Sequence, residues 1–185
     1  MGRRVFLSLF QSVTPRTAGF NTADLTALSE TGQTLTIGLM LIGGSPGSTA
    51  GGMKTTTAAV LIACAIAIFR RRENGRFFGR RISDETVKNA VTVFLMYISL
   101  FLLGGMIISR VENLPILTCL FETASAIGTV GLTLGITPGL HAVSKLILIS
   151  LMFMGRIGGL TLIFATLSAN KNTLSKLPLE KITVG

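Results

Sequence analysis

Two short turns in this chain of 185 residues place a threonine two positions before a glycine: Thr17-Ala18-Gly19 and Thr129-Val130-Gly131. Backbone carbonyls can replace the water around a potassium ion when the chain holds them toward a common axis. Glycine permits the backbone angles that this needs, and the threonine adds a hydroxyl to the same row of oxygens. One Thr-x-Gly could be an ordinary extracellular turn. A pair of them, each after a short apolar segment, favours cation coordination without any reaction on the substrate. The predicted filter positions are Thr17, Ala18, Gly19, Phe20, Asn21, Gly128, Thr129, Val130, Gly131 and Leu132.

An internal repeat links the two turns. When the chain is shifted on itself by 112 positions without a gap, residues 17–21 fall on 129–133, and residues 39–43 fall on 151–155. A repeat reports a repeated structural unit, and parallel repeats are common in membrane transport proteins. A chance match of small residues in apolar sequence is the weaker explanation, because both the turn and the following helix match. The repeated unit is a half-helix, a Thr-x-Gly turn and a helix that runs inward.

A glycine-rich segment interrupts the apolar residues 31–69. As one helix, at about 1.5 Å per residue, this stretch would be nearly twice the ~30 Å thickness of a bilayer core. Pro46 and the clustered glycines around it disfavour helix, so we expect a break there. Lipid cannot satisfy the freed backbone groups, so the loop should lie against the pore. A phosphate-binding loop is excluded because Met53 separates Gly52 from Lys54.

Arg156 is a charge inside a predicted membrane helix, where charges are costly and usually functional. Snorkelling to the cytoplasmic interface is the alternative. Ser168 lies twelve positions after Arg156, roughly 18 Å of helix, which favours a pore position over snorkelling.

Other charged residues are less decisive. Glu122, in the second half-helix, either attracts cations or forms hydrogen bonds to the filter backbone, and the sequence does not separate these roles. We expect Asp24 and Glu112 to be solvated outer residues, and His141 to lie at the interface rather than to bind a ligand.

The composition indicates a membrane protein. Only 14% of the residues are charged and the mean hydropathy is +0.66, whereas soluble domains carry about a quarter charged residues. Residues 31–69, 89–109 and 146–169 are nearly free of charge, which predicts at least three membrane passes. No nucleophile–base pair, metal cluster or carboxylate pair is evident, so we do not expect an enzyme.

The basic residues set the predicted orientation. The net charge is +9, and arginines crowd residues 70–81 while lysines occupy the tail. The positive-inside rule places both regions on the cytoplasmic side of a multi-pass membrane protein. Binding of nucleic acid or anionic lipid is the less favoured explanation of the arginines, because membrane passes flank them.

These patterns divide the chain into two units and a tail. Residues 1–85 are predicted to hold a half-helix (5–16), a filter (17–21), a broken inner helix (31–69) and a basic cytoplasmic loop (70–85). Residues 86–170 are predicted to hold an outer helix (86–109), a half-helix (115–127), a filter (128–133) and an inner helix (141–168). Residues 171–185 are predicted to form a cytoplasmic C-terminal tail.

Several runs resemble the Trk/Ktr/HKT superfamily of potassium transporters. Residues 12–22 and 126–133 look like its filter segments, residues 43–54 resemble its intramembrane loop, and residues 155–161 resemble its last inner helix. The ending, residues 178–185, is similar to the C-terminus of the Ktr ion-translocating subunit. The resemblance covers almost the whole chain and is closest to the C-terminal half of that membrane subunit.

The resemblance implies an all-α integral membrane fold of helix–re-entrant half-helix–helix repeats of potassium-channel type. The chain would supply the third repeat, in part, and the fourth of a four-repeat pore. It would take up K⁺ across the plasma membrane, with K⁺ bound at filter carbonyls as the transported ion and no cofactor. The implied gate is Gly43, Gly44, Ser45, Pro46, Gly47, Ser48, Thr49, Ala50, Gly51, Gly52, Lys54 and Arg156.

The resemblance also implies partners. These are the missing N-terminal repeats or another copy of the chain, a homodimer of the membrane subunit, a cytosolic nucleotide-binding regulatory ring and the lipid bilayer, with no nucleic acid. The alternative is a non-conducting truncated or split-gene fragment, because two filter segments do not enclose a pore that needs four.

Overall fold

The computed structural model describes residues 2–22, 24–71, 75–77 and 80–158. This part is mostly helical. The longer elements are α1 (Gly2–Val13), α2 (Glu30–Leu41), α3 (Thr55–Phe69), α4 (Asp84–Glu112), α5 (Ile116–Ile127) and α6 (Ala142–Ile157). The shorter elements are the 3₁₀ turns η1 (Leu25–Ala27) and η2 (Thr137–Gly139) and the strands β1 (Arg76–Phe77) and β2 (Arg80–Arg81).

Helix α4 is the one helix of the described residues that is long and apolar enough to cross a bilayer. The Ser83 side chain caps it by accepting the N–H of Thr86 at 3.2 Å, and Asp84 and Glu85 favour its positive N-terminal end. It ends at Asn113, which has a left-handed φ of 54°. The sequence predicted 86–109, and the caps extend the helix at both ends.

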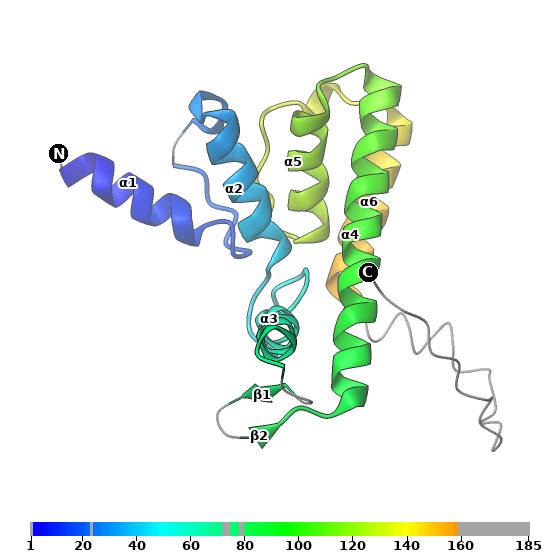
Figure 1. Cartoon of the computed structure of the whole chain (residues 1–185). Coiled ribbons are helices and arrows are strands. Elements are labelled where there is room, and N and C mark those ends of the chain that lie inside the picture. The colour runs from blue at the N-terminus through cyan, green and yellow to red at the C-terminus, as the bar shows by residue number, and fades with distance from the viewer. Residues whose placement is uncertain (1, 23, 72–74, 78–79, 159–185) are drawn as a thin grey trace.

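Helix α5 is the buried centre of the fold. Figure 1 shows α5 between α2 and α4, with α6 behind α4. All residues from Phe121 to Ile127 are buried. Gly104 and Gly105 of α4 allow the close packing, because a Cβ atom on Gly105 would lie 2.5 Å from a methyl of Leu120 on α5. With 12 residues, α5 is too short to cross a bilayer.

Backbone hydrogen bonds join the two ends of the loop between α2 and α3. Gly43 N–H donates to the Met53 carbonyl at 2.8 Å, and Met53 N–H donates to the Leu41 carbonyl at 3.3 Å. These bonds form a parallel bridge between Ile42 and Met53 at the neck of the loop. Helix α3 is seen nearly end-on in Figure 1, so it lies across the direction of α4. The neck satisfies backbone groups that lipid could not.

Two predicted helices end early. Helix α1 stops at Val13 rather than running to residue 16, because the residue before Pro15 is disfavoured in helix. The prediction of a continuous helix over 141–168 is wrong at Gly158, whose φ of 88° ends α6 at Ile157. Residues 159–168 and the tail 171–185 lie outside the described residues.

The basic segment 70–85 contains structure that the sequence did not predict. Strands β1 and β2 pair antiparallel, with Arg76 opposite Arg81 and Phe77 opposite Arg80. Arg81 also lies 3.9 Å from Asp84, and both side chains are exposed. A pair this exposed contributes little to stability.

Candidate ion filter and gate loop

The two Thr-x-Gly turns have the same unusual backbone. Thr17 and Thr129 have φ angles of 62° and 51°, and Gly19 and Gly131 have φ angles of 72° and 90°. Positive φ is uncommon for a residue with a Cβ atom. Residues of alternating handedness turn successive N–H groups to one side, and so turn the carbonyls to the other. Both turns can therefore present a row of carbonyl oxygens.

The turns touch each other and are fixed to their own half-helices. A Cβ atom on Gly19 would collide with the carbonyl of Val130. The buried hydroxyl of Thr14 donates to the Phe20 carbonyl at 2.7 Å, and the Ser125 hydroxyl accepts the N–H of Gly131 at 3.2 Å. The structure thus brings together two predicted filter segments that are far apart in the sequence.

The glycine-rich loop reaches the second turn directly. The N–H of Gly51 donates to Oγ1 of Thr129 at 3.1 Å. A Cβ atom on Gly51 would lie only 2.6 Å from Cγ2 of Thr129, so a larger residue does not fit there. The next residue, Gly52, donates its N–H to the Gly155 carbonyl of α6 at 3.3 Å. The loop therefore bridges the filter turn and the end of α6.

The outer part of the loop is held by Lys54. Its ammonium donates to the Ser48 carbonyl at 3.2 Å and to the Ala50 carbonyl at 2.6 Å. Residues 45–49 are exposed, whereas Gly43, Gly51 and Gly52 are buried. The predicted gate loop thus has a buried part at Gly43, Gly51 and Gly52 and an exposed part at residues 45–49. Hydrogen bonds from Lys54 hold the loop at Ser48 and Ala50.

Arg156 lies in the last turn of α6, where a cation is favoured by the helix dipole. It follows Gly155, whose carbonyl receives the Gly52 N–H. The Arg156 side chain is exposed, and no hydrogen bond or ion pair joins it to the other described residues. The contact with the loop is made by the Gly155 carbonyl, next to Arg156 in the chain, and not by the Arg156 guanidinium.

The expectation that Glu112 is solvated is wrong. Its side chain is 6% exposed, and it accepts the backbone N–H of His141 at 2.8 Å while lying 2.8 Å from the Nδ1 atom of the same histidine. Sequence alone did not reveal this contact, because it depends on the end of α4 meeting the start of α6. Asp24 is exposed as expected, and it accepts hydrogen bonds from the N–H and hydroxyl of Thr26.

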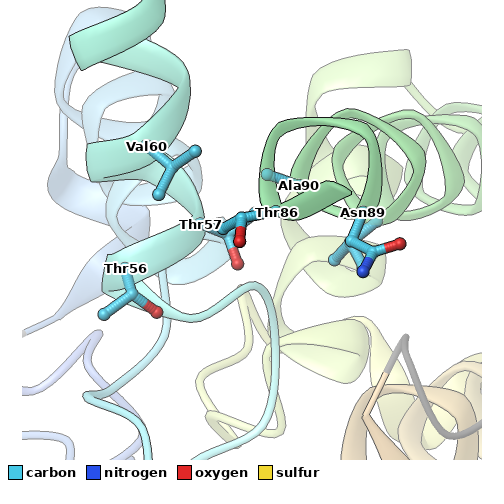
Figure 2. A pocket seen from close by; sticks show the side chains of 7 residues that line it. Thr56, Thr57, Val60, Thr86, Asn89 and Ala90 are labelled. Carbon is cyan, nitrogen blue, oxygen red and sulfur yellow. The ribbon is translucent and has the colours of Figure 1, made fainter. Parts of the chain in front are cut away.

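A separate crevice of about 280 Å³ lies between α3 and α4. Figure 2 shows Thr56, Thr57 and Val60 on α3 and Thr86, Asn89 and Ala90 on α4 around it. No predicted filter or gate residue lines this crevice. It leaves space beside the first turn of α3, directly after the gate loop.

The family of the chain is decided by a match over nearly all of its length. The model of the TrkH family, described as a cation transport protein, matches residues 1–174. The chain belongs to the TrkH family.

Individual relatives and a solved structure support the same family assignment. The chain is 43% identical over 188 residues to the potassium/sodium uptake protein NtpJ of Enterococcus hirae, covering 98% of this chain and 42% of that protein. It is 41% identical to the Ktr system potassium uptake protein B of Bacillus subtilis, covering 88% of this chain and 36% of that protein. The crystal structure of the potassium transporter TrkH from Vibrio parahaemolyticus matches with a TM-score of 0.70 and 26% identity, over 85% of this chain and 36% of that one.

The prediction of a Trk/Ktr family member is confirmed by these matches. The described part of the chain is mostly helical, and its TrkH-family relatives are ion transporters rather than enzymes. The chain spans less than half the length of the relatives that it matches.

Proposed function

We propose that this TrkH-family chain supplies two of the four segments of a potassium filter, and a loop that gates it, for K⁺ uptake across the plasma membrane. The observation that carries the proposal is the hydrogen bond from Gly51 to Thr129. This bond places the glycine-rich, non-helical loop against the second predicted filter turn, at the hydroxyl of Thr129. No catalytic chemistry is needed.

The filter works by replacing water. Residues 17–21 and 128–132 offer carbonyls, and Thr129 adds a hydroxyl at the end nearest the loop. Potassium passes because these oxygens replace its hydration shell, and several weak sites in series let it leave again. The shared left-handed angles at Thr17 and Thr129 support equivalent roles for the two turns.

The gate works by moving the loop away from Thr129. In the present arrangement two backbone N–H groups join the loop to its surroundings: Gly51 donates to the Thr129 hydroxyl, and Gly52 donates to the Gly155 carbonyl. Each hydrogen bond is worth about 0.5–1.5 kcal/mol net, so release costs on the order of 1–3 kcal/mol. A cost this small suits a switch. The crevice beside Thr56 and Thr57 gives the start of α3 space to follow the loop.

Arg156 completes the gate as a positive charge at the level of the loop. Its guanidinium repels cations from the resting pore, and its backbone neighbour Gly155 anchors Gly52. The proposal includes the cytoplasmic placement of residues 70–81 and of the C-terminus. It also includes a homodimer and a regulatory nucleotide-binding ring, which the family resemblance implies. The relatives named as proteins of a Ktr system support a role as one subunit of a system.

A non-conducting fragment remains the second candidate, because one observation favours it. The chain covers about two fifths of the Enterococcus hirae relative and contributes two filter turns. On this hypothesis the chain folds but conducts only when the other repeats are supplied.

One experiment tests both candidates: the chimera tests the proposed filter, and the chain alone tests whether the chain conducts without the other repeats. The chain is expressed alone and as a chimera in which it replaces the matching segment of the Enterococcus hirae relative, in Enterococcus hirae cells that lack their own potassium uptake systems. The proposal predicts growth at low K⁺ with the chimera. Growth with the chain alone would mean that copies of the chain complete the pore, and no growth with either, at normal membrane abundance, would reject the proposed function.

A further inference from the structure

Glu122 lies in the middle of α5, and its carboxylate is enclosed by the segment that follows the second filter turn. Its residue is 4% exposed. We propose that Glu122 is a positioning residue: by accepting hydrogen bonds it holds residues 133–137, which directly follow the second filter turn, and it does not act as a charge that attracts cations. This inference rests on the proposed filter.

Three hydrogen bonds join the carboxylate to this segment. Oε1 accepts the Thr133 hydroxyl at 2.5 Å and the Leu134 N–H at 3.0 Å, and Oε2 accepts the Thr137 hydroxyl at 2.9 Å. Thr133 also accepts the N–H of Gly135 at 2.9 Å. A single side chain therefore fixes the segment from residue 133 to residue 137.

Ser125 extends the same anchor toward the filter turn. Glu122 and Ser125 are three positions apart on α5 and so lie on one face of the helix. The Ser125 hydroxyl accepts the N–H of Gly131, and its carbonyl accepts the N–H of Val130 at 2.9 Å. Successive turns of α5 thus hold the filter turn at Val130 and Gly131 and the residues after it, 133–137.

The contacts favour hydrogen bonding over attraction of ions. A carboxylate offers about four lone-pair directions, and three are occupied by donors of the protein. The buried side chain presents almost no surface to a passing cation. A carboxylate that attracts ions would need an open oxygen.

The first filter segment is held in a different way. The 112-position offset places Phe10 where Glu122 stands, and the Thr14 hydroxyl binds the Phe20 carbonyl instead. The carboxylate anchor therefore belongs to the second segment, and its loss should affect that segment alone.

Two reciprocal substitutions in the chimera test the proposal. Glu122→Gln removes the charge, but its carbonyl can accept from Thr133 and Leu134 while its amide donates to Thr137. Glu122→Asp keeps the charge but is one methylene shorter, so it loses reach to the segment. Glu30→Gln, at an exposed residue of α2, is the control for charge alone.

The readouts are membrane abundance, the KM for K⁺ uptake and the ratio of K⁺ to Na⁺ uptake. We expect Glu122→Gln and Glu30→Gln to stay within about twofold of the parent chimera, and Glu122→Asp to lower the ratio about fivefold or more. The opposite order, with Glu122→Asp normal and Glu122→Gln impaired, would assign Glu122 the charge role and overturn the inference. Equal and normal values for both variants would overturn it too.

Amide hydrogen exchange in the purified chimera keeps this inference distinct from the proposed function. We expect the peptide that contains Leu134 to exchange faster in Glu122→Asp than in the parent or in Glu122→Gln. This result is expected even if the parent chimera carries no K⁺, an outcome that would reject the proposed function only. Unchanged exchange in Glu122→Asp would overturn the positioning role.

Discussion

The N–H of Gly51 donates to the hydroxyl oxygen of Thr129 at 3.1 Å, across 78 positions of the chain. This bond joins the loop between α2 and α3 to the turn after α5. The distance leaves no room for a side chain at position 51, because its Cβ atom would overlap Thr129. The close contact between the loop and the filter turn therefore depends on the glycine at position 51.

Gly51→Ala should break this contact. The added methyl collides with Thr129, so the loop moves from the filter and the resting K⁺ flux rises, on the order of tenfold for the loss of two hydrogen bonds. Initial rubidium uptake by the chimera measures the effect. Gly38→Ala is the matched control, because a Cβ atom at this exposed helical position meets nothing within 4 Å. An unchanged flux in Gly51→Ala would contradict the gate.

The two filter glycines should differ in their tolerance of alanine. Both have left-handed φ angles, which cost roughly 1–2 kcal/mol for a residue with a Cβ atom. At Gly19 the methyl would also collide with the Val130 carbonyl, whereas nothing lies within 4 Å of a Cβ atom at Gly131. Gly19→Ala should therefore lower the ratio of K⁺ to Na⁺ uptake more than Gly131→Ala. The reverse order would mean that the two turns do not meet in the working pore.

Arg156→Gln should raise the K⁺ flux without changing selectivity. The substitution removes a positive charge at the end of α6 but leaves the carbonyls of both filter turns in place. Arg110→Gln, at an exposed residue of α4, controls for the change in net charge. A rise in Na⁺ uptake relative to K⁺ in Arg156→Gln would show that the arginine acts on the filter itself.

Glu112→Ala should reduce stability and leave the filter alone. It removes the acceptor of the His141 N–H at the start of α6, so this backbone donor loses its partner. The Tm of the purified chimera should therefore fall below that of the parent chimera, which thermal unfolding measures. A change in the ratio of K⁺ to Na⁺ uptake, with Tm unchanged, would refute this assignment.

The sequence predicted the features that depend on residue type and spacing. Repeated Thr-x-Gly turns, and a proline among glycines in a stretch too long for one helix, needed no tertiary information. The adjacent glycines Gly158 and Gly159 also favour the end of a helix. The prediction of one helix over 141–168 overlooked them.

The contacts between distant elements could not be predicted. Nothing in residues 43–52 identifies Thr129 as the partner of Gly51, because the contact requires α2 to pack on α5. The same holds for Glu112, whose partner His141 depends on how α4 meets α6. The role of Glu122 stayed open because its three donors come from an irregular segment whose path is set by packing.

The most direct test of the account is the ion flux of the purified chimera in liposomes. We predict that rubidium enters, that K⁺ competes with it, and that an equal concentration of Na⁺ competes much less. Rubidium entry that Na⁺ blocks as well as K⁺ does, or no entry at all from correctly folded protein, would contradict the claim that Thr17–Asn21 and Gly128–Leu132 form a potassium filter.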